Sequence, residues 1–185
     1  LQQTFAETTS PRLLDVDGIK QRITAALIGD GAPAKMVGGD VADAIEVEAM
    51  VETARRSYGG LHLAVNNAGI GGPAAPTGEY PLDGWHKVID TNLHSVFYGL
   101  RYEIPAIIAS GGGAIVNMAS ILGSVGFANA SAYVAAKHGV VGVTKVAAME
   151  YAKHGVRINS IGPGFIDTPL LDGPVAATWS LALAG

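Results

Sequence analysis

Short apolar runs alternate along the chain with longer segments that have helical periodicity. The apolar runs predict five strands, at 12–16, 35–41, 61–66, 113–119 and 156–161. The longer segments predict four helices, at 18–28, 43–58, 84–108 and 131–153. Alternation of this kind is typical of βαβ units around a parallel sheet. The pattern therefore predicts an α/β fold.

Residues at the segment boundaries agree with these ranges. Asp43 and Asp83 are expected to cap two of the helices at their N-termini. Gly29, Gly59 and Gly111 are expected to end three helices in the left-handed conformation. The runs LHLAVN and GAIVNMA are apolar at successive positions, which predicts strands buried on both faces of the sheet.

Composition limits the class of protein. The 185 residues are enough for one domain, and we expect a single domain over 1–185. Only 15% of the residues are charged and 49% are hydrophobic. The net charge is -4 and the basic residues are scattered, which argues against a nucleic-acid partner. The chain has no cysteine, and its five histidines lack ligand spacing, so we expect no metal site.

A membrane span and a secretory signal are not expected either. The uncharged stretch from Ile104 to Ala136 is long enough to cross a bilayer. It contains Pro105 and three consecutive glycines at 111–113, so it predicts a helix end, a turn, a buried strand and a loop. No basic start precedes an apolar run with a cleavage site. We therefore expect a cytoplasmic protein.

Two glycine-rich segments have a loose likeness to a dinucleotide-binding turn. The segment at 29–34 follows a predicted helix and precedes a predicted strand, which is the reverse of the required order. The segment at 69–74 follows a strand, but Pro73, Pro76 and Pro81 prevent an immediate helix. Both are interpreted as ordinary turns.

Several polar residues form a candidate site. Tyr133 and Lys137 are four residues apart on a predicted helix, so both side chains project from one face. There the lysine ammonium would favour the phenolate and lower the pKa of the tyrosine. Ser120 ends a predicted strand at the carboxyl edge, where open α/β sheets bind ligands. Asn92 lies inside a predicted helix, where asparagine is unfavourable.

The segment at 129–131 is a formal glycosylation sequon, which we interpret as a helix cap.

Together these motifs resemble the short-chain dehydrogenase/reductase (SDR) family. The matching motifs are NNAG at 66–69, DTNL at 90–93, Ser120, YVAAK at 133–137 and GPGFIDTP at 162–169. The resemblance covers the chain from about 13 to 169 and implies a Rossmann-like, doubly wound parallel sheet in three α/β/α layers. The family's first strand with its glycine-rich turn, and its last helix and strand, have no counterpart here. We expect the 185 residues to be part of a longer enzyme, with a repurposed relative as the alternative.

The resemblance implies a catalytic set. Tyr133 would be the general acid/base that exchanges a proton with the substrate oxygen, and Ser120 would hydrogen-bond that oxygen. Lys137 would lower the pKa of the tyrosine and hold the nicotinamide ribose. Asn92 would anchor a water relay that renews the proton.

The resemblance also implies a cofactor site. Its residues would be Asp15, Asp40, Val41, Asn67, Ala68, Gly69, Tyr133, Lys137, Pro163, Gly164, Ile166 and Thr168. A carboxylate at Asp15 would bind the ribose hydroxyls and repel a 2′-phosphate, which favours NAD over NADP. NADP remains open because Arg12 is close in sequence, and Asp17 could share the role of Asp15.

The implied function is an NAD(P)(H)-dependent oxidoreductase that interconverts a secondary alcohol and a ketone. The two longest predicted helices carry small residues suited to close packing between subunits, so a homotetramer or homodimer is expected. The alternative is a non-catalytic binding protein on the same scaffold. The apolar residues of 169–185 are compatible with an apolar substrate, and equally with an amphipathic helix that packs on the core.

Overall fold

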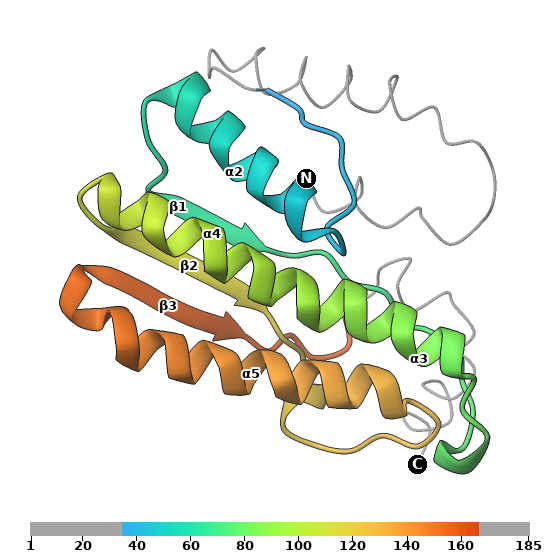
Figure 1. Cartoon of the computed structure of the whole chain (residues 1–185). Helices are drawn as coiled ribbons and strands as arrows, with labels where there is room; N and C mark the ends of the chain where they lie inside the picture. Colours follow the sequence, from blue (N-terminus) through green and yellow to red (C-terminus); the bar gives the residue numbers. More distant parts are fainter. Residues whose placement is uncertain (1–34, 167–185) are drawn as a thin grey trace.

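A parallel three-stranded sheet forms the centre of the protein, in a computed structural model that describes residues 35–166. The strands are β1 (Leu63–Asn66), β2 (Gly113–Met118) and β3 (Val156–Ile161), in the spatial order β1-β2-β3 (Figure 1). They confirm three of the five predicted strands, and β3 has the predicted bounds. The predicted strand 12–16 and helix 18–28 lie outside the described residues.

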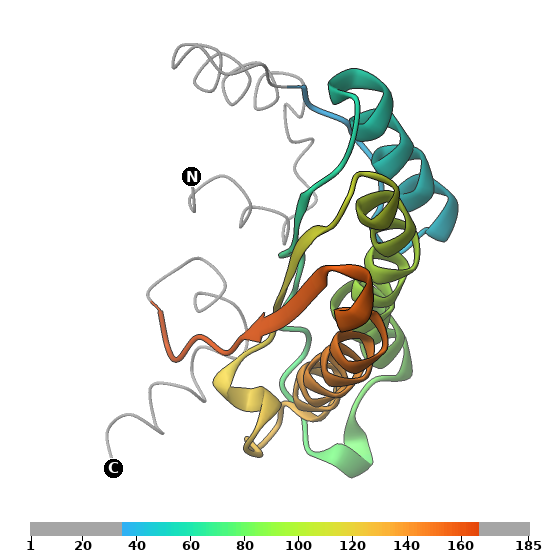
Figure 2. The ribbon, with the colours of Figure 1, turned by 90° about the vertical axis from the view of Figure 1, so that its left-hand side faces the viewer.

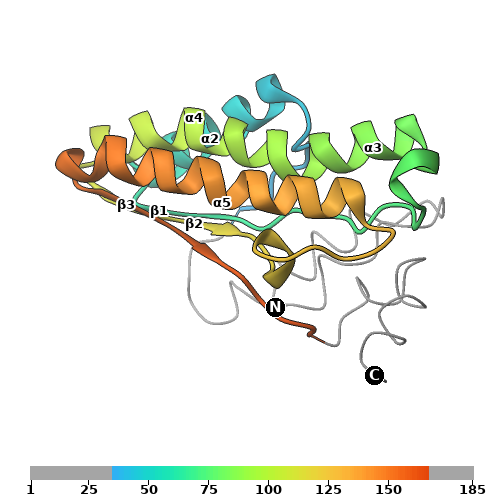
Figure 3. The same cartoon turned by 90° about the horizontal axis from the view of Figure 1, so that it is seen from below.

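Four α-helices cover one face of this sheet. They are α2 (Ala44–Tyr58), α3 (Leu82–Ile89), α4 (Ser95–Ala109) and α5 (Ser131–Tyr151). Short helical turns also occur at η2 (Thr77–Glu79), η4 (Ile121–Gly123) and η5 (Ala152–His154), and η3 (Asp90–His94) is a π-helix. Seen edge-on, all four α-helices lie on the same side of the strands (Figures 2 and 3). The described residues therefore form two layers of the three that the resemblance implies.

Burial along the strands alternates, because the described helices cover only one face of the sheet. Ile115, Val156 and Ile158 point towards the helices and are buried. On the opposite face, Leu63 and Val65 are 72% and 63% exposed. The expectation of strands buried on both faces is therefore not met within residues 35–166.

The main hydrophobic core fills the space between the sheet and the helices α4 and α5. Each large side chain buried there contributes about 1.5–3 kcal/mol relative to its exposed state. The core consists of Val96, Leu100, Ile104, Ile107, Ile115, Ala119, Val140, Ala147, Val156 and Ile158. It holds α4 and α5 firmly against the strands that carry the candidate site.

The segment predicted as a strand at 35–41 has no regular structure up to residue 40, and residue 41 lies in a turn. A strand needs a neighbour for its backbone N–H and C=O groups, and β1 is the last strand on that side of the sheet in the described residues. Gly38 and Gly39 further weaken its tendency to form a strand. The prediction was wrong for this segment.

The helix predicted at 84–108 is divided in two. Helix α3 begins earlier, at Leu82, and Pro81 is its N-cap, so Asp83 lies in the first turn and does not cap the helix. The π-helix η3 then joins α3 to α4, which ends at Ala109 and contains Pro105. A π-helix inserts one extra residue into a helical turn, and a sequence pattern based on period 3.6 does not detect it.

The other predicted helix boundaries are confirmed in part. Asp43 caps α2 by accepting hydrogen bonds from the N–H groups of residues 45 and 46, as predicted. Gly59 and Gly111 have positive φ values of 79° and 92°, as expected of residues that end helices. The cap predicted at 129–131 was wrong, because Ala130 is the N-cap of α5 and has no side chain that could cap. The Ser131 hydroxyl instead lies 2.6 Å from the Thr77 hydroxyl. The glycine-rich segment 69–74 has no regular structure, and no α-helix directly follows it, so it lacks the order that a dinucleotide-binding turn requires, as expected.

Within residues 35–166, none of the helices has the length and apolar character needed to span a bilayer. The same part of the chain has no cluster of three or more histidine, aspartate or glutamate side chains that could bind a metal ion.

Candidate active site

The four residues predicted to be catalytic come from three parts of the chain and meet near the carboxyl edge of the sheet. Asn92 lies in η3, and Ser120 is the N-cap of η4, just after β2. Tyr133 and Lys137 lie one turn apart in α5. Because parallel strands end at the same edge, residues that follow β1, β2 and β3 are brought together there.

Tyr133 and Ser120 are in direct contact. Tyr133 is buried, and its phenol forms a side-chain hydrogen bond with Ser120. The Ser120 hydroxyl oxygen also accepts a hydrogen bond of 3.2 Å from the Leu122 N–H, which fixes its position. Burial raises the pKa of Tyr133 above its usual value of 10.0, and the bond with Ser120 offsets only part of that shift. The phenol is therefore protonated at neutral pH.

This result differs from the expectation that Lys137 lowers the pKa of the tyrosine. The Lys137 ammonium lies 5.7 Å from the centroid of the Tyr133 ring, a cation–π distance. Desolvation of the phenolate dominates the pKa shift in the protein alone, and Lys137 is not among its causes. A lower pKa for Tyr133 requires an additional positive charge or hydrogen-bond donor.

Lys137 is held by the backbone at the end of β2. Its ammonium donates a hydrogen bond of 2.7 Å to the Met118 carbonyl oxygen. Burial lowers the pKa of Lys137 from 10.5 to about 8. The sequence alone did not point to Met118, because any residue type offers a backbone carbonyl as a hydrogen-bond acceptor.

Asn92 fixes the loop that follows β1. Its side-chain oxygen accepts a hydrogen bond from the Ile70 N–H, and its amide donates one to the Ile70 carbonyl, each at 2.8 Å. Asn92 is fully buried. This paired contact explains why asparagine stands inside a helical segment, since its amide offers a donor and an acceptor side by side to the same backbone residue.

Gly69 lies close to two of these residues. A β-carbon at this position would lie 3.5 Å from the Asn92 side-chain oxygen and 3.6 Å from the Lys137 nitrogen. Gly69 itself is exposed, as is Asn67 before it, and Ala68 is half-buried. A ligand atom above Gly69 could therefore approach a buried ammonium and a carbonyl-type acceptor at close range.

The loop after β3 lies against Ser120. The Ala119 N–H donates to the Ile161 carbonyl and the Ile121 N–H donates to the Pro163 carbonyl, both at 2.8 Å. These bonds place Pro163 and Gly164 beside the η4 turn, whereas Ile166 is exposed. Of the residues assigned to the cofactor, Asp15 and Thr168 lie outside the described residues.

Asp40 and Val41 are not joined to this group by the hydrogen bonds that they make. Asp40 bonds locally: its N–H donates to Glu46, its side chain accepts from the Ala42 N–H, and its carbonyl accepts from the Asp43 N–H. These contacts form the turn that leads into α2. The assignment of both residues to the adenine remains a prediction.

Tyr133 belongs to an apolar cluster. The rings of Phe127 and Phe165 lie 6.4 Å apart, and both pack against the cluster that contains Tyr133. The buried members of this cluster are Tyr80, Val88, Leu122, Ala130, Ala132 and Tyr133. A reacting group at Tyr133 would therefore be in an environment of low polarity.

A match to known proteins decides the family. A family model described as "Enoyl-(Acyl carrier protein) reductase" matches residues 12–180. The chain belongs to the short-chain dehydrogenase/reductase family. Membership in the SDR family agrees with the order of the parallel strands and with the grouping of residues from all five motifs at one edge.

Curated SDR relatives are similar over most of this chain. A cyclohexanol dehydrogenase of Acinetobacter sp. (strain SE19) is 52% identical over 151 residues, which cover 82% of this chain and 60% of that protein. A cis-4-hydroxycyclohexanecarboxylate dehydrogenase of Sinomonas cyclohexanicum is 42% identical, with coverage of 82% and 61%. The chain thus spans about 60% of the length of these curated relatives.

Two solved SDR structures have the same fold. A levodione reductase superposes with a TM-score of 0.78 at 38% identity, covering 85% of this chain and 60% of that one. A xylitol dehydrogenase with bound NAD⁺ gives a TM-score of 0.77 at 30% identity, with coverage of 80% and 57%. The described sheet and its helices are therefore part of a Rossmann fold.

Proposed function

We propose that the protein is an NAD(P)-dependent oxidoreductase that interconverts a secondary alcohol and a ketone, with Tyr133 as the general acid/base. The observation that carries this proposal is the Tyr133 phenol, which is hydrogen-bonded to Ser120 and has the Lys137 ammonium 5.7 Å from its ring. A phenol, a hydroxyl and a cation around one point suit proton exchange with an alcohol oxygen. Relatives named as alcohol dehydrogenases support the same reaction class.

The exposed backbone at Gly69 suits the close approach of a nicotinamide cofactor. Because Gly69 has no side chain, a ligand atom can take the place of a β-carbon, 3.5 Å from the Asn92 oxygen and 3.6 Å from the Lys137 nitrogen, and the ammonium is a suitable donor for ribose hydroxyls. Asn67, Ala68, Pro163 and Gly164 would line the same site. The cofactor, when bound, accepts or returns the hydride. NAD is favoured over NADP on the strength of Asp15, in the sequence alone.

The protein's own residues would handle the proton. In ketone reduction, the protonated Tyr133 donates to the substrate oxygen while the Ser120 hydroxyl holds that oxygen in place. In alcohol oxidation, the phenolate accepts the same proton, and the Lys137 ammonium stabilises the negative charge. Asn92, through Ile70, would keep the loop after β1 in position.

An apolar, cyclic secondary alcohol is the proposed substrate class. Phe127, Phe165 and Trp85 pack around the cluster that contains Tyr133, and they offer apolar surface to such a ring. The two relatives described above are named for cyclohexanol and for a hydroxycyclohexane carboxylate.

Cofactor reduction by the purified chain tests the proposal. With cyclohexanol and NAD⁺, we expect turnover that falls at least about 100-fold in Tyr133→Phe, because the variant lacks the acid/base hydroxyl. The control is Tyr58→Phe, an exposed tyrosine on α2 that should leave turnover unchanged. A parallel run with NADP⁺ tests the cofactor preference.

The outcome also separates the two candidate functions. A chain that neither turns over cyclic alcohols nor gains thermal stability with NAD⁺ or NADP⁺ would be a non-catalytic binding protein, contrary to the proposal. Cofactor binding that persists in Tyr133→Phe would place the loss at the proton step.

A homotetramer or homodimer is part of this proposal. Exposed apolar side chains occur on both long helices, namely Phe97 on α4 and Val146 and Met149 on α5. They offer a surface for a second copy of the chain. Light scattering should give a multiple of 18.9 kDa that Met149→Glu reduces, and a monomeric mass for the unmodified chain would refute this part.

A further inference from the structure

Glu103 is a carboxyl group inside the core. It lies on α4, only 4% exposed, on the side that carries the buried residues Leu100, Ile104 and Ile107. Its side-chain oxygen Oε2 accepts a hydrogen bond of 3.0 Å from the Asn66 amide. A buried carboxyl group is costly unless its hydrogen bonds are satisfied, so this position calls for a physical reason.

The carboxyl is the first member of a network that crosses the fold. The Asn66 amide donates both to Glu103 and, at 2.9 Å, to the Asn117 side-chain oxygen. The Asn117 amide donates to the Thr144 hydroxyl at 2.9 Å, and this hydroxyl donates to the Val140 carbonyl at 2.6 Å. The network therefore links α4, β1, β2 and α5 in a single row.

Asn66 and Asn117 are partners in the register of β1 and β2. Both lie near the carboxyl ends of their strands. Because the Asn66 nitrogen uses both of its hydrogens in this network, its side chain has one orientation that satisfies both acceptors. That orientation ties the two strand ends together through their side chains as well as through the backbone ladder.

Helix α4 also holds Asn66 by close packing. Gly99 lies one turn before Glu103, so both residues are on the same side of α4. A β-carbon at Gly99 would overlap the Asn66 amide group. The Asn66 amide therefore lies between the Glu103 carboxyl, to which it donates a hydrogen bond, and the backbone of α4 at Gly99, where no side chain intervenes.

We propose that Glu103 is a positioning residue: through Asn66 and Asn117, its carboxyl fixes the carboxyl ends of β1 and β2. The loop at 67–70, which Asn92 binds, begins directly after Asn66. The Met118 carbonyl, which holds Lys137, follows Asn117. Glu103 does not contact Ser120, Tyr133 or Lys137. Any effect of Glu103 on turnover rests on the proposed function.

No charged side chain in residues 35–166 is among the causes of the shifted pKa of Glu103. Burial raises that pKa from 4.5 to about 7, and the Asn66 hydrogen bond opposes the rise. Strands β1 and β2 contain no titratable residue. Glu48, Glu52 and Arg55 of α2 line the groove between α2 and α4. The other elements packed against α4 are η3, β3 and α5. Their titratable or charged residues are Asp90 and His94 on η3, Arg157 on β3, and Tyr133, Lys137, His138, Lys145, Glu150 and Tyr151 on α5.

The carboxyl therefore changes charge near neutral pH. The native state keeps the proton up to about pH 7, whereas the unfolded chain releases it near 4.5. The native state binds more protons in this window, so its stability falls as the pH rises from 4.5 through 7. The buried negative charge above this window weakens the contact between α4 and the strand ends.

Hydrogen exchange of the full chain tests the proposal without any assay of activity. The readout is the protection of segments 66–70 and 117–121, corrected for intrinsic exchange, at pH about 6 and about 8. In the unmodified protein we expect protection to fall severalfold at the higher pH. Glu103→Gln, which keeps an acceptor for Asn66 and cannot ionise, should show no such fall.

Two further variants complete the design. Glu103→Leu keeps the volume without the acceptor, and should lower protection of the two segments about tenfold at both pH values. Glu150→Gln removes an exposed glutamate and should behave like the unmodified protein. A pH dependence retained in Glu103→Gln would overturn the proposal, even if Glu103→Leu failed to fold. So would unchanged protection in Glu103→Leu.

A kinetic readout then separates positioning from simple stability. With cyclohexanol and NAD⁺, Glu103→Leu should lower kcat more than it raises KM, and Glu103→Gln should restore kcat. Equal kcat in all three proteins would contradict a positioning role. If the unmodified protein showed no turnover, the proposed function would fail, whereas the exchange result would still decide the role of Glu103.

Discussion

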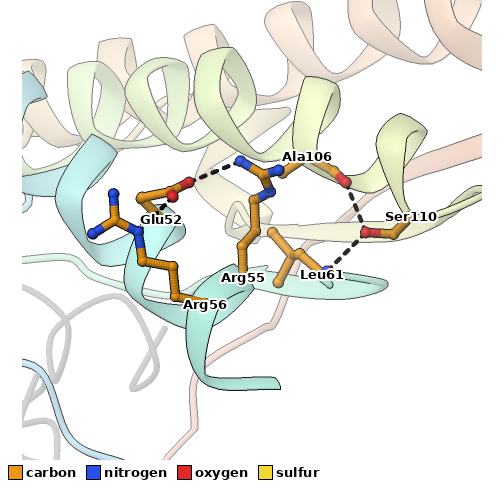
Figure 4. A network of polar contacts seen from close by, with 6 residues as sticks. All are labelled: Glu52, Arg55, Arg56, Leu61, Ala106 and Ser110. Atoms are coloured by element: carbon orange, nitrogen blue, oxygen red, sulfur yellow. Dashed lines mark hydrogen bonds and ion pairs between the residues drawn. The ribbon is translucent and has the colours of Figure 1, made fainter. Parts of the chain in front are cut away.

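The two ends of β1 are built from different kinds of polar contact. Before its amino end, the Ser110 hydroxyl accepts from the Leu61 N–H and donates to the Ala106 carbonyl, each at 2.9 Å. Close by, Glu52 pairs with Arg55 at 2.8 Å and with Arg56 at 2.7 Å (Figure 4). At its carboxyl end the contacts are those of the buried row from Glu103 to Thr144.

The difference lies in the exposed ion pairs, which only the amino end has among the contacts compared. The ion pairs near the amino end join residues three or four positions apart on an exposed helix surface, where such pairs contribute little. Contacts at the carboxyl end join residues 19 to 51 positions apart and are largely removed from water. Burial shifts the pKa values of Glu103, Tyr133 and Lys137, which all belong to the carboxyl end, so this end is the chemically distinctive one.

The largest effect is expected where two backbone groups depend on one buried side chain. In Asn92→Leu, the Ile70 N–H and C=O groups both lose their partner, which should reduce the free energy of unfolding by about 4 kcal/mol. Chemical denaturation measures the change. His94→Gln, an exposed substitution in the same π-helix, is the control. A loss below about 1 kcal/mol would show that Asn92 does not hold this loop.

Lys137 should give the carboxyl end a characteristic pH dependence. Its pKa is lowered to about 8 in the folded protein, so the unfolded chain binds the extra proton between about pH 8 and 10. The free energy of unfolding should therefore rise over this window, by up to about 3 kcal/mol, as the pH increases. The rise should be absent in Lys137→Met. An equal rise in both proteins would assign it to other groups.

A smaller effect is expected near the amino end. Ser110→Ala removes the acceptor of the Leu61 N–H, which is half-buried and can recruit water in part. We expect a loss of about 1 kcal/mol in the free energy of unfolding, with no change in turnover. Ser124→Ala, at an exposed position, serves as the control. Lost turnover in Ser110→Ala would remove the distinction between the two ends.

The smallest effect belongs to the surface ion pairs. The hydrogen bond from Arg56, together with the charges of both arginines, holds the pKa of Glu52 below 4.5. Any stability from this shift would be present at neutral pH and lost as the pH falls through the lowered pKa. Because Glu52 is in contact with solvent, we expect Glu52→Gln to leave the melting temperature unchanged within error at neutral pH. A clear loss would mean that the amino end also depends on charge.

Sequence reasoning succeeded where a feature is local or where a motif carries it. The bounds of β3 and the cap at Asp43 follow from apolar runs and from a residue type that prefers one position. It failed at 35–41, because an apolar run says nothing of whether a partner strand lies beside it. It also missed Glu103, although a single acid among the apolar positions of α4 is a detectable signal.

The sequence by itself determined the family, the parallel α/β arrangement and the identity of Asn92, Ser120, Tyr133 and Lys137 as candidates, since those depend on residue types and their spacing. Only the tertiary structure decided how the groups influence one another. Burial raises the pKa of Tyr133 against the expected effect of Lys137, and the row from Glu103 to Thr144 exists only when four separate elements are packed together. Desolvation and long-range hydrogen bonds arise from packing, and no spacing in the chain encodes their magnitude.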